Sequence, residues 1–140
     1  MLPKIIYPIT FLKTKNLEEN RNFYSTLLKF NIALKQANCI IYNVGLNSYW
    51  GFCETNEEIS TSEKTCLTLV VETSKEVNIW ADFLKKKGVN LTKEPSMYEK
   101  YHIYNIFFKD PDGYSLEIQS FESGHEPKNV KKIRNDDSLK

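Results

Sequence analysis

The chain has 140 residues, which is enough for one domain with a hydrophobic core of ordinary size. Its 19 Lys and Arg residues nearly balance its 18 Asp and Glu residues, so the bulk charge predicts neither a nucleic acid nor a membrane surface as a partner. The sequence contains no apolar run of about 18 residues, so it predicts no membrane span.

The number and spacing of the cysteines indicate whether the protein resides in a reducing or an oxidising compartment of the cell. Cys39, Cys53 and Cys66 are odd in number and have no CxxC spacing. This pattern argues against a disulfide framework and a structural zinc site, and favours a reducing cytosol. The start of the chain is too short and interrupted for a signal peptide. We therefore expect a cytoplasmic protein.

The first half of the chain, residues 5–54, predicts a strand, a helix and further strands. Asn16 can cap a helix that has Glu19 at its third position, and apolar residues at helical spacing continue to Leu28. Strands are expected over residues 9–12, 39–44 and 49–53.

The second half, residues 64–121, repeats this order. Thr73 and Glu76 have capping-box spacing, and Gly88 ends the helix that follows them. Strands are expected over residues 66–71, 101–108 and 114–121. Neither half can close a stable sheet alone, so the two are expected to pair side by side. The sequence thus predicts an α+β fold of tandem βαβββ modules in a single domain, residues 1–121.

Two polar segments flank the second module. Residues 55–64 are polar and acidic, as is typical of a linker. Residues 122–140 form a polar tail, with a short helical piece expected over residues 130–134.

The most specific motif is a hairpin near the end of the second module. Residues 110–113, Asp-Pro-Asp-Gly, predict a type I turn. In the strand behind it, Leu116 and Ile118 point to one face, and Glu117 and Gln119 to the other. A lone carboxylate on such a strand is either a solvated edge residue or a residue held in a cleft, and the pattern leaves both open.

Two motifs within these repeated modules carry a family resemblance. The first helix ends in Phe-Tyr-x-x-Leu-Leu at residues 23–28, and the closing hairpin reads Phe-x-Asp-Pro-Asp-Gly-x-x-x-Glu at residues 108–117. Over residues 5–121 the chain resembles the vicinal oxygen chelate superfamily of glyoxalases, bleomycin resistance proteins and ring-cleaving dioxygenases. The resemblance implies that the modules curl into a cup, and that metal-using members hold a divalent ion there, such as Zn, Mn, Fe or Ni. Lys29 stands where the family usually has a Gly.

The resemblance also assigns positions for metal ligands. Glu117 falls on the family's carboxylate position, and Cys66 falls where metal-using members usually have His. The first-strand position of the first module falls on Ile9 or Thr10, and its fourth-strand position falls near Gly51. A thiolate and a carboxylate are a mixed soft and hard pair, and two ligands seldom hold a hard divalent ion, while a zinc site normally needs three or four. Glu117 and Cys66 are the candidate catalytic residues, and Glu117 is a candidate metal ligand only if atypical partners join it.

The two histidines do not complete this ligand set. His125 lies in the tail. By alternation along its strand, His102 points away from the face that Asn105 and Phe107 present to the cup. We therefore expect no third ligand from His102.

The residues expected to bind substrate are Phe11, Tyr49, Cys53, Asn105 and Phe107. With Glu117 at its floor, such a cup suits a small, flat, partly apolar molecule. One hypothesis is a metal-free protein, like the bleomycin resistance members, that sequesters an aromatic or cationic small molecule. The alternative is a metal-dependent lyase, isomerase or dioxygenase that uses Glu117. The missing histidines favour the first, or an enzyme whose chemistry differs from the family's usual one. The resemblance further implies a homodimer, with exchanged modules in some members.

Overall fold

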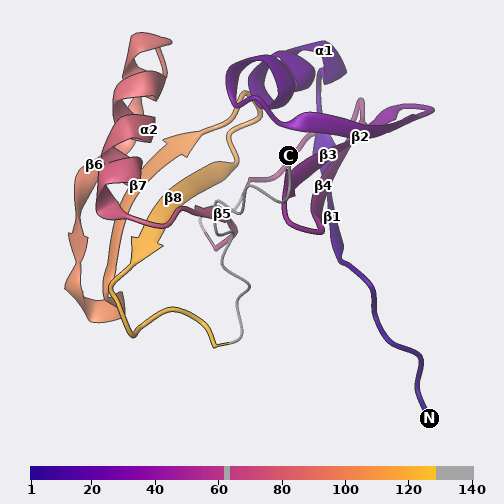
Figure 1. Ribbon diagram of the computed structural model, residues 1–140. Coiled ribbons are helices and arrows are strands. Elements are labelled where there is room, and N and C mark those ends of the chain that lie inside the picture. The colour runs from indigo at the N-terminus through magenta and orange to yellow at the C-terminus, as the bar shows by residue number, and fades with distance from the viewer. Residues whose placement is uncertain (62–63, 129–140) are drawn as a thin grey trace.

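The computed structural model describes residues 1–61 and 64–128, and it confirms the α+β fold. These residues form two four-stranded sheets with strand orders β1-β4-β3-β2 and β5-β8-β7-β6 (Figure 1). In each sheet the first and last strands of the module run parallel, and the other neighbours run antiparallel. The identical order shows that the two modules are structural repeats.

The first module begins its helix as the sequence predicts. Its elements are β1 (Ile9–Thr14), α1 (Leu17–Arg21), the π-helix η1 (Asn22–Leu27), β2 (Asn31–Gln36), β3 (Cys39–Gly45) and β4 (Ser48–Glu54). The Asn16 side chain caps α1 by accepting a hydrogen bond from Glu19 N at 3.0 Å. Lys29 follows the helix with a φ of 67°, a left-handed conformation that explains why Gly is usual there.

The second module also follows its predicted start and stop signals. Its elements are β5 (Cys66–Val70), α2 (Ser74–Lys86), β6 (Leu91–Tyr98), the 3-10 turn η2 (Glu99–Tyr101), β7 (Ile103–Lys109) and β8 (Ser115–Phe121). Thr73 and Glu76 form the capping box, and Gly88 takes a φ of 81° after the helix.

The sequence did not predict strands β2 and β6. Each of them forms one edge of its sheet, opposite β1 and β5 respectively. Most of their side chains are exposed, so neither strand has an apolar run that predicts it. Pro95 lies within β6, a position that an edge strand tolerates. The third strand of module two also begins later than predicted, because residues 99–101 form η2.

The Asp-Pro-Asp-Gly turn forms as predicted between β7 and β8. Gly113 N donates to Asp110 O at 3.0 Å. Asp110 Oδ1 accepts hydrogen bonds from the backbone N–H groups of Asp112 and Tyr114, both at 2.9 Å. This network fixes the start of β8 and so the position of Glu117.

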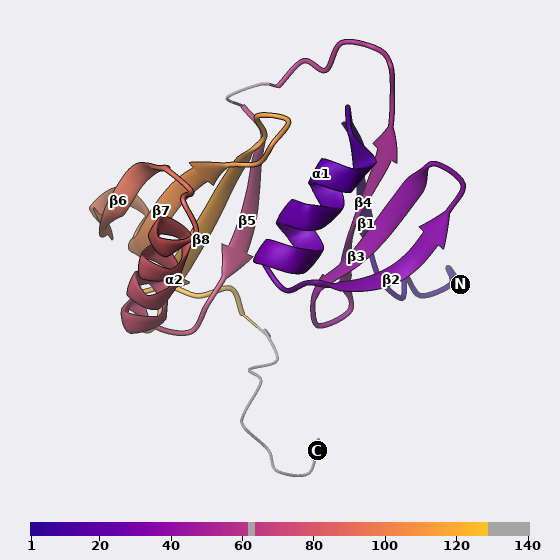
Figure 2. The same ribbon diagram turned by 90° about the horizontal axis from the view of Figure 1, so that it is seen from above.

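The turn also joins the two modules. The first helix lies between the sheets (Figure 2), and the buried Tyr24 hydroxyl donates to Asp110 Oδ2 at 2.7 Å. Nearby, the rings of Phe23 and Phe108 lie 6.3 Å apart. Burial raises the pKa of Asp110, although its hydrogen bonds oppose that shift. The helix-facing sides of both sheets therefore share one core, and the opposite, inner faces carry no helix of their own module.

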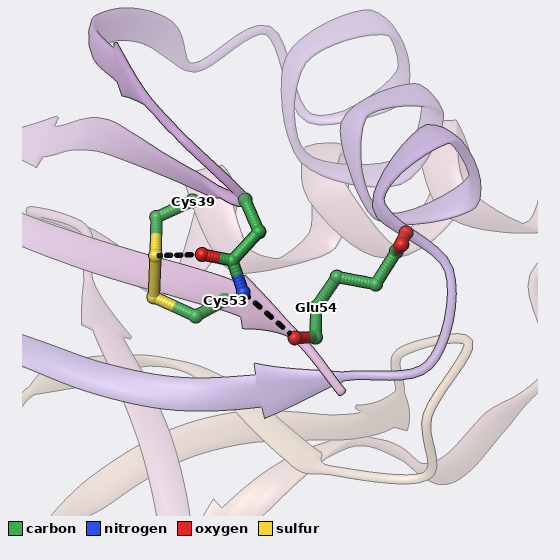
Figure 3. Close-up of a disulfide and its surroundings, with 4 residues drawn as sticks. Cys39, Cys53 and Glu54 are labelled. Atoms are coloured by element: carbon green, nitrogen blue, oxygen red, sulfur yellow. Dashed lines mark hydrogen bonds between the residues drawn. A yellow bond between two sulfur atoms is a disulfide. The ribbon is translucent and has the colours of Figure 1, made fainter. Parts of the chain in front are cut away.

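A disulfide joins Cys39 on β3 to Cys53 on β4 (Figure 3). The two residues are direct partners in the β3–β4 register, which brings their Cα atoms within 4.1 Å. Beside them, the Asn38 side chain donates to Glu54 O at 2.9 Å. The prediction from cysteine count was wrong, because the count does not reveal cross-strand register. The disulfide also removes the cysteine argument for a reducing compartment.

The ends of the described chain carry little regular structure. Residues 1–8 lead away from the body of the domain without a helix or strand (Figure 1). The predicted helical piece at residues 130–134 lies outside the described residues. Within the part of the chain that the structure describes, no helix combines the length and the apolar character needed to cross a membrane.

Candidate functional site

A cavity of about 590 Å³ lies on the inner face of the second sheet, opposite α2. This volume is within the range of small-molecule sites. Its polar lining consists of Cys66, Thr92, Asn105, Ser115, Glu117 and Gln119. Its apolar lining consists of Tyr98, Tyr101, Ile103, Phe107 and Phe121. The predicted alternation along β7 and β8 is confirmed, because Asn105, Phe107 and Glu117 share this face.

Glu117 is held in the cavity and is not a solvated edge residue. It is only 8% exposed. The Thr68 hydroxyl donates to its Oε1 at 2.8 Å, and the Asn105 side-chain amide donates to its Oε2 at 2.6 Å. Both carboxylate oxygens are therefore stabilised by neutral donors from the neighbouring strands β5 and β7.

Lys93 on β6 completes this polar network. Its Nζ donates to Asn105 Oδ1 at 2.6 Å and to Ser96 Oγ at 2.7 Å. Desolvation lowers the pKa of Lys93, and the negative charge of Glu117 partly opposes that shift. Asn105 thus bridges an ammonium group and a carboxylate, and this fixes which way its amide points.

The register between the four strands of module two places Thr68, Glu117 and Lys93 on one line across the sheet. Thr68 on β5 pairs with Glu117 on β8, Glu117 pairs with Phe107 on β7, and Phe107 pairs with Lys93 on β6. Side chains of directly paired residues lie on the same face of a sheet. The four residues therefore form a row across the inner face of module two.

Cys66 lies in the same cavity, two residues before Thr68 on β5. Its Sγ is 3.6 Å from Thr68 Oγ1. Desolvation raises the pKa of the Cys66 thiol; the Thr68 contact opposes this shift and the charge of Glu117 adds to it. A raised pKa keeps the thiol protonated at neutral pH, which weakens it as a nucleophile.

Two tyrosines form an exposed aromatic wall of the cavity. The rings of Tyr98 and Tyr101 meet edge to face with centroids 5.1 Å apart. They are 42% and 55% exposed. Rings that remain this accessible can contact a ligand without any rearrangement of the core.

The remaining predicted binding residues lie elsewhere. Phe11 and Tyr49 are on the inner face of module one, and Cys53 is in the disulfide. The cavity is lined by module two alone, so none of these three contributes to it. The shared core of the helix-facing sides explains this separation, because it joins the modules through the opposite faces of their sheets.

The inner face of module one carries a row of apolar residues and one glycine, at the place where module two carries the row that contains Glu117. The paired residues across this sheet are Phe11, Gly51, Ile41 and Leu34. Phe11 lies over Gly51 so closely that a Cβ atom there would be 2.4 Å from its ring. Phe11 and Leu34 are 54% and 49% exposed. Module one therefore offers an apolar surface with no carboxylate at its centre.

Comparison with known proteins agrees with this fold. The model of the Glyoxalase/Bleomycin resistance protein/Dioxygenase superfamily matches residues 8–118. The chain belongs to this superfamily. None of the curated proteins compared with the chain matches it.

Solved structures of the glyoxalase superfamily and related proteins have the same fold. An integron cassette protein from the mobile metagenome of the Halifax Harbour sewage outfall matches with a TM-score of 0.72 and 25% identity, over 85% of this chain and all of that one. A glyoxalase/bleomycin resistance protein/dioxygenase from Nocardioides has a TM-score of 0.72 and 18% identity, over 94% of this chain and 92% of its own. A lactoylglutathione lyase from Agrobacterium tumefaciens has a TM-score of 0.68 and 15% identity, over 84% of this chain and 94% of its own.

The residues around Glu117 do not fit the divalent metal of the glyoxalase superfamily. Its hydrogen-bond partners are a neutral hydroxyl and a neutral amide, and the one further candidate ligand in the cavity lining is the soft thiol of Cys66. Gly51 and Ile9 offer no ligand atom. Within residues 1–61 and 64–128, three metal-ligating side chains come together only at His102, Glu122 and His125, outside the cavity.

Several residues that line the cavity or hydrogen-bond to its lining were not predicted from the sequence. Thr68 and Gln119 could have been found by counting two residues along the strand from Cys66 and Glu117. Lys93 and Tyr98 lie on β6, which carries no strong strand signal, and Tyr101 lies in the turn that follows it. No sequence signal pointed to these three.

Proposed function

We propose that this glyoxalase-superfamily protein binds a small, partly apolar molecule in the module-two cavity, without the family's usual metal. The observation that carries the proposal is the environment of Glu117. A buried carboxylate lines an accessible cavity that four aromatic side chains also line. Ligand sites commonly combine an apolar lining with a few placed polar groups.

The chemistry of the cavity favours a ligand with a donor group, such as an amine. A carboxylate has about four lone-pair positions, and Thr68 and Asn105 occupy two of them. The remaining positions can accept hydrogen bonds from a ligand. A positively charged donor would also be attracted by the faces of Tyr98 and Tyr101. We therefore propose a cationic alkylamine that carries an aromatic ring as the representative ligand class.

The alternative, a metal-dependent lyase, isomerase or dioxygenase, has less support. Such chemistry needs an ion with open coordination positions, held by three or more side chains in a zinc site. The side chains that hydrogen-bond to Glu117 are a neutral hydroxyl and a neutral amide, and the cavity lining adds one thiol, Cys66. This donor set favours binding of an organic ligand over binding of a metal.

Nuclear magnetic resonance can test the proposal with two matched probes, benzylamine and benzoate. We expect benzylamine to shift the side-chain amide signals of Asn105 and Gln119, and benzoate to have little effect because Glu117 repels it. Glu117→Gln should leave the fold intact and weaken benzylamine binding by about tenfold or more, since a charged hydrogen bond is lost. Glu94→Gln, the same change at an exposed site on β6, is the control. Equal binding of the two probes, or no shift with either, would overturn the proposal.

We also propose that the protein is a homodimer in which the apolar row of module one is covered by a second copy. Exposed apolar residues of β1 and β2 support this, since contiguous patches of this kind mark interaction surfaces. A second copy seated over the cavity would bring its Phe11 and Tyr49 close to the Glu117 site. The predicted cup would then be completed between chains.

A further inference from the structure

Three potential metal ligands converge at the end of module two, outside the proposed cavity. His102 precedes β7, Glu122 follows β8, and His125 lies three residues further on. Ligand atoms of the three side chains all lie within 4.8 Å of one another. All three residues are exposed, so an ion has direct access to them.

The backbone holds this cluster together. Ile103 and Phe121 form the last pair of the β7–β8 ladder, and Glu122 N extends that ladder by donating to His102 O at 2.9 Å. A turn then brings the chain back, with His125 N donating to Glu122 O at 3.0 Å. The backbone positions of the three residues are therefore fixed by hydrogen bonds of the strand pairing and of one turn.

The side chains are spaced for a shared ion. His102 Nδ1 and Glu122 Oε2 are hydrogen-bonded at 3.0 Å. An ion that replaces the shared proton needs only a small separation of these atoms, because two tetrahedral ligands of one zinc ion lie about 3.3 Å apart. The rings of His102 and His125 stack with centroids 3.8 Å apart. Because His125 is exposed, rotation about its side-chain bonds can direct a ring nitrogen toward the same point.

We propose that His102, Glu122 and His125 bind a divalent transition ion of the zinc, cobalt or nickel class. Two imidazoles and one carboxylate are ligands that these ions accept, and three protein ligands leave one position open for water. The site is distinct from the cavity, since none of the three residues lines it. Its neighbours in the chain, Tyr101 and Phe121, do line the cavity, so a bound ion would tie the end of β8 to the aromatic wall.

The test is a cobalt titration of the full chain prepared without a histidine tag, followed by visible absorption and by competition with zinc. We expect one ion per chain in a site that zinc can displace. His102→Ala and His125→Ala should each weaken cobalt binding by at least about tenfold, and Glu122→Gln should weaken it as well. Circular dichroism should show that these exposed substitutions leave the fold intact, and His125→Gln provides a conservative second variant.

Two variants of the cavity serve as matched controls. Glu117→Gln and Cys66→Ala should bind cobalt as the wild type does, because they lie outside the cluster. The proposal is overturned if wild-type protein binds no stoichiometric ion, or if His102→Ala and His125→Gln bind cobalt as tightly as wild type. It is also overturned if the cavity variants lose the ion while the histidine variants keep it. None of these outcomes depends on whether the cavity binds an amine.

Discussion

The side-chain amide of Asn105 donates a hydrogen bond to Glu117 Oε2 at 2.6 Å. Its carbonyl oxygen accepts one from Lys93 Nζ, also at 2.6 Å. A single neutral side chain therefore helps to set the orientation of the Glu117 carboxylate and bridges it to the Lys93 ammonium group. Because Asn105 is almost fully buried, neither hydrogen bond can be replaced easily by water.

Asn105→Leu should lower the free energy of unfolding by about 1–3 kcal/mol, because it leaves Glu117 Oε2 and Lys93 Nζ without this buried partner. Urea denaturation would measure the change. Asn90→Leu, at an exposed position before β6, should change stability by less than about 0.5 kcal/mol. Equal effects of the two substitutions would show that the bridge contributes nothing.

The buried carboxyl group of Asp110 should make stability depend on pH. Its pKa is raised by burial, so the folded state binds a proton at a higher pH than the unfolded state does. Its contribution to stability is therefore fully present below the unfolded pKa, and is lost as the pH rises through the folded pKa. We expect wild type to gain stability relative to Asp110→Asn as the pH falls from neutral to about pH 4.

Urea unfolding of both proteins at several pH values tests this. The difference between their free energies of unfolding isolates Asp110, because the other groups titrate in both proteins. A difference that moves in favour of Asp110→Asn at low pH would contradict the account.

The sequence predicted most of the fold because its signals are local. The Asn16 cap, the capping box at Thr73 and the turn at Asp110 each depend on residues within a few positions of one another. The edge strands β2 and β6 were missed because they are polar and exposed, and tertiary pairing forms them.

The part of the site that depends on local alternation along a strand was also predicted from the sequence. Alternation along β7 and β8 placed Asn105, Phe107 and Glu117 on one face correctly. The partner of Cys39, however, depends on the register between strands β3 and β4, and Lys93 reaches Asn105 only through the pairing of β6 with β7. Register between separate segments is not encoded in residue spacing, so these contacts needed the structure.

The disulfide should stabilise the first module. It links residues 14 positions apart, and closing a loop of this length is worth about 3 kcal/mol. We expect Cys39→Ala with Cys53→Ala to lower the free energy of unfolding by about 2–4 kcal/mol. Thiol titration of the unreduced protein should find one free group, Cys66.

Cys66→Ala is the control, and should remove that reactive thiol without a comparable loss of stability. Three reactive thiols in unreduced protein would contradict the assignment.

Phe11→Asp should dissociate the proposed homodimer, because it places a charge at the centre of the apolar row on module one. The monomer should stay folded, since Phe11 is 54% exposed. Sedimentation velocity would measure the change in mass. Ile79→Asp, at another exposed apolar position on α2, should leave the mass unchanged. A wild-type protein that is monomeric at all concentrations would refute the dimer.

Calorimetry can decide whether the Glu117 cavity binds its ligand without metal, if benzylamine binding is measured in the presence of a strong chelator and again after addition of zinc or manganese. Metal-independent binding in the Glu117 cavity predicts the same affinity in both conditions, and a loss of about tenfold or more in Glu117→Gln. Binding that appears only after metal is added, together with an ion that Glu117→Gln releases, would show instead that Glu117 is a metal ligand.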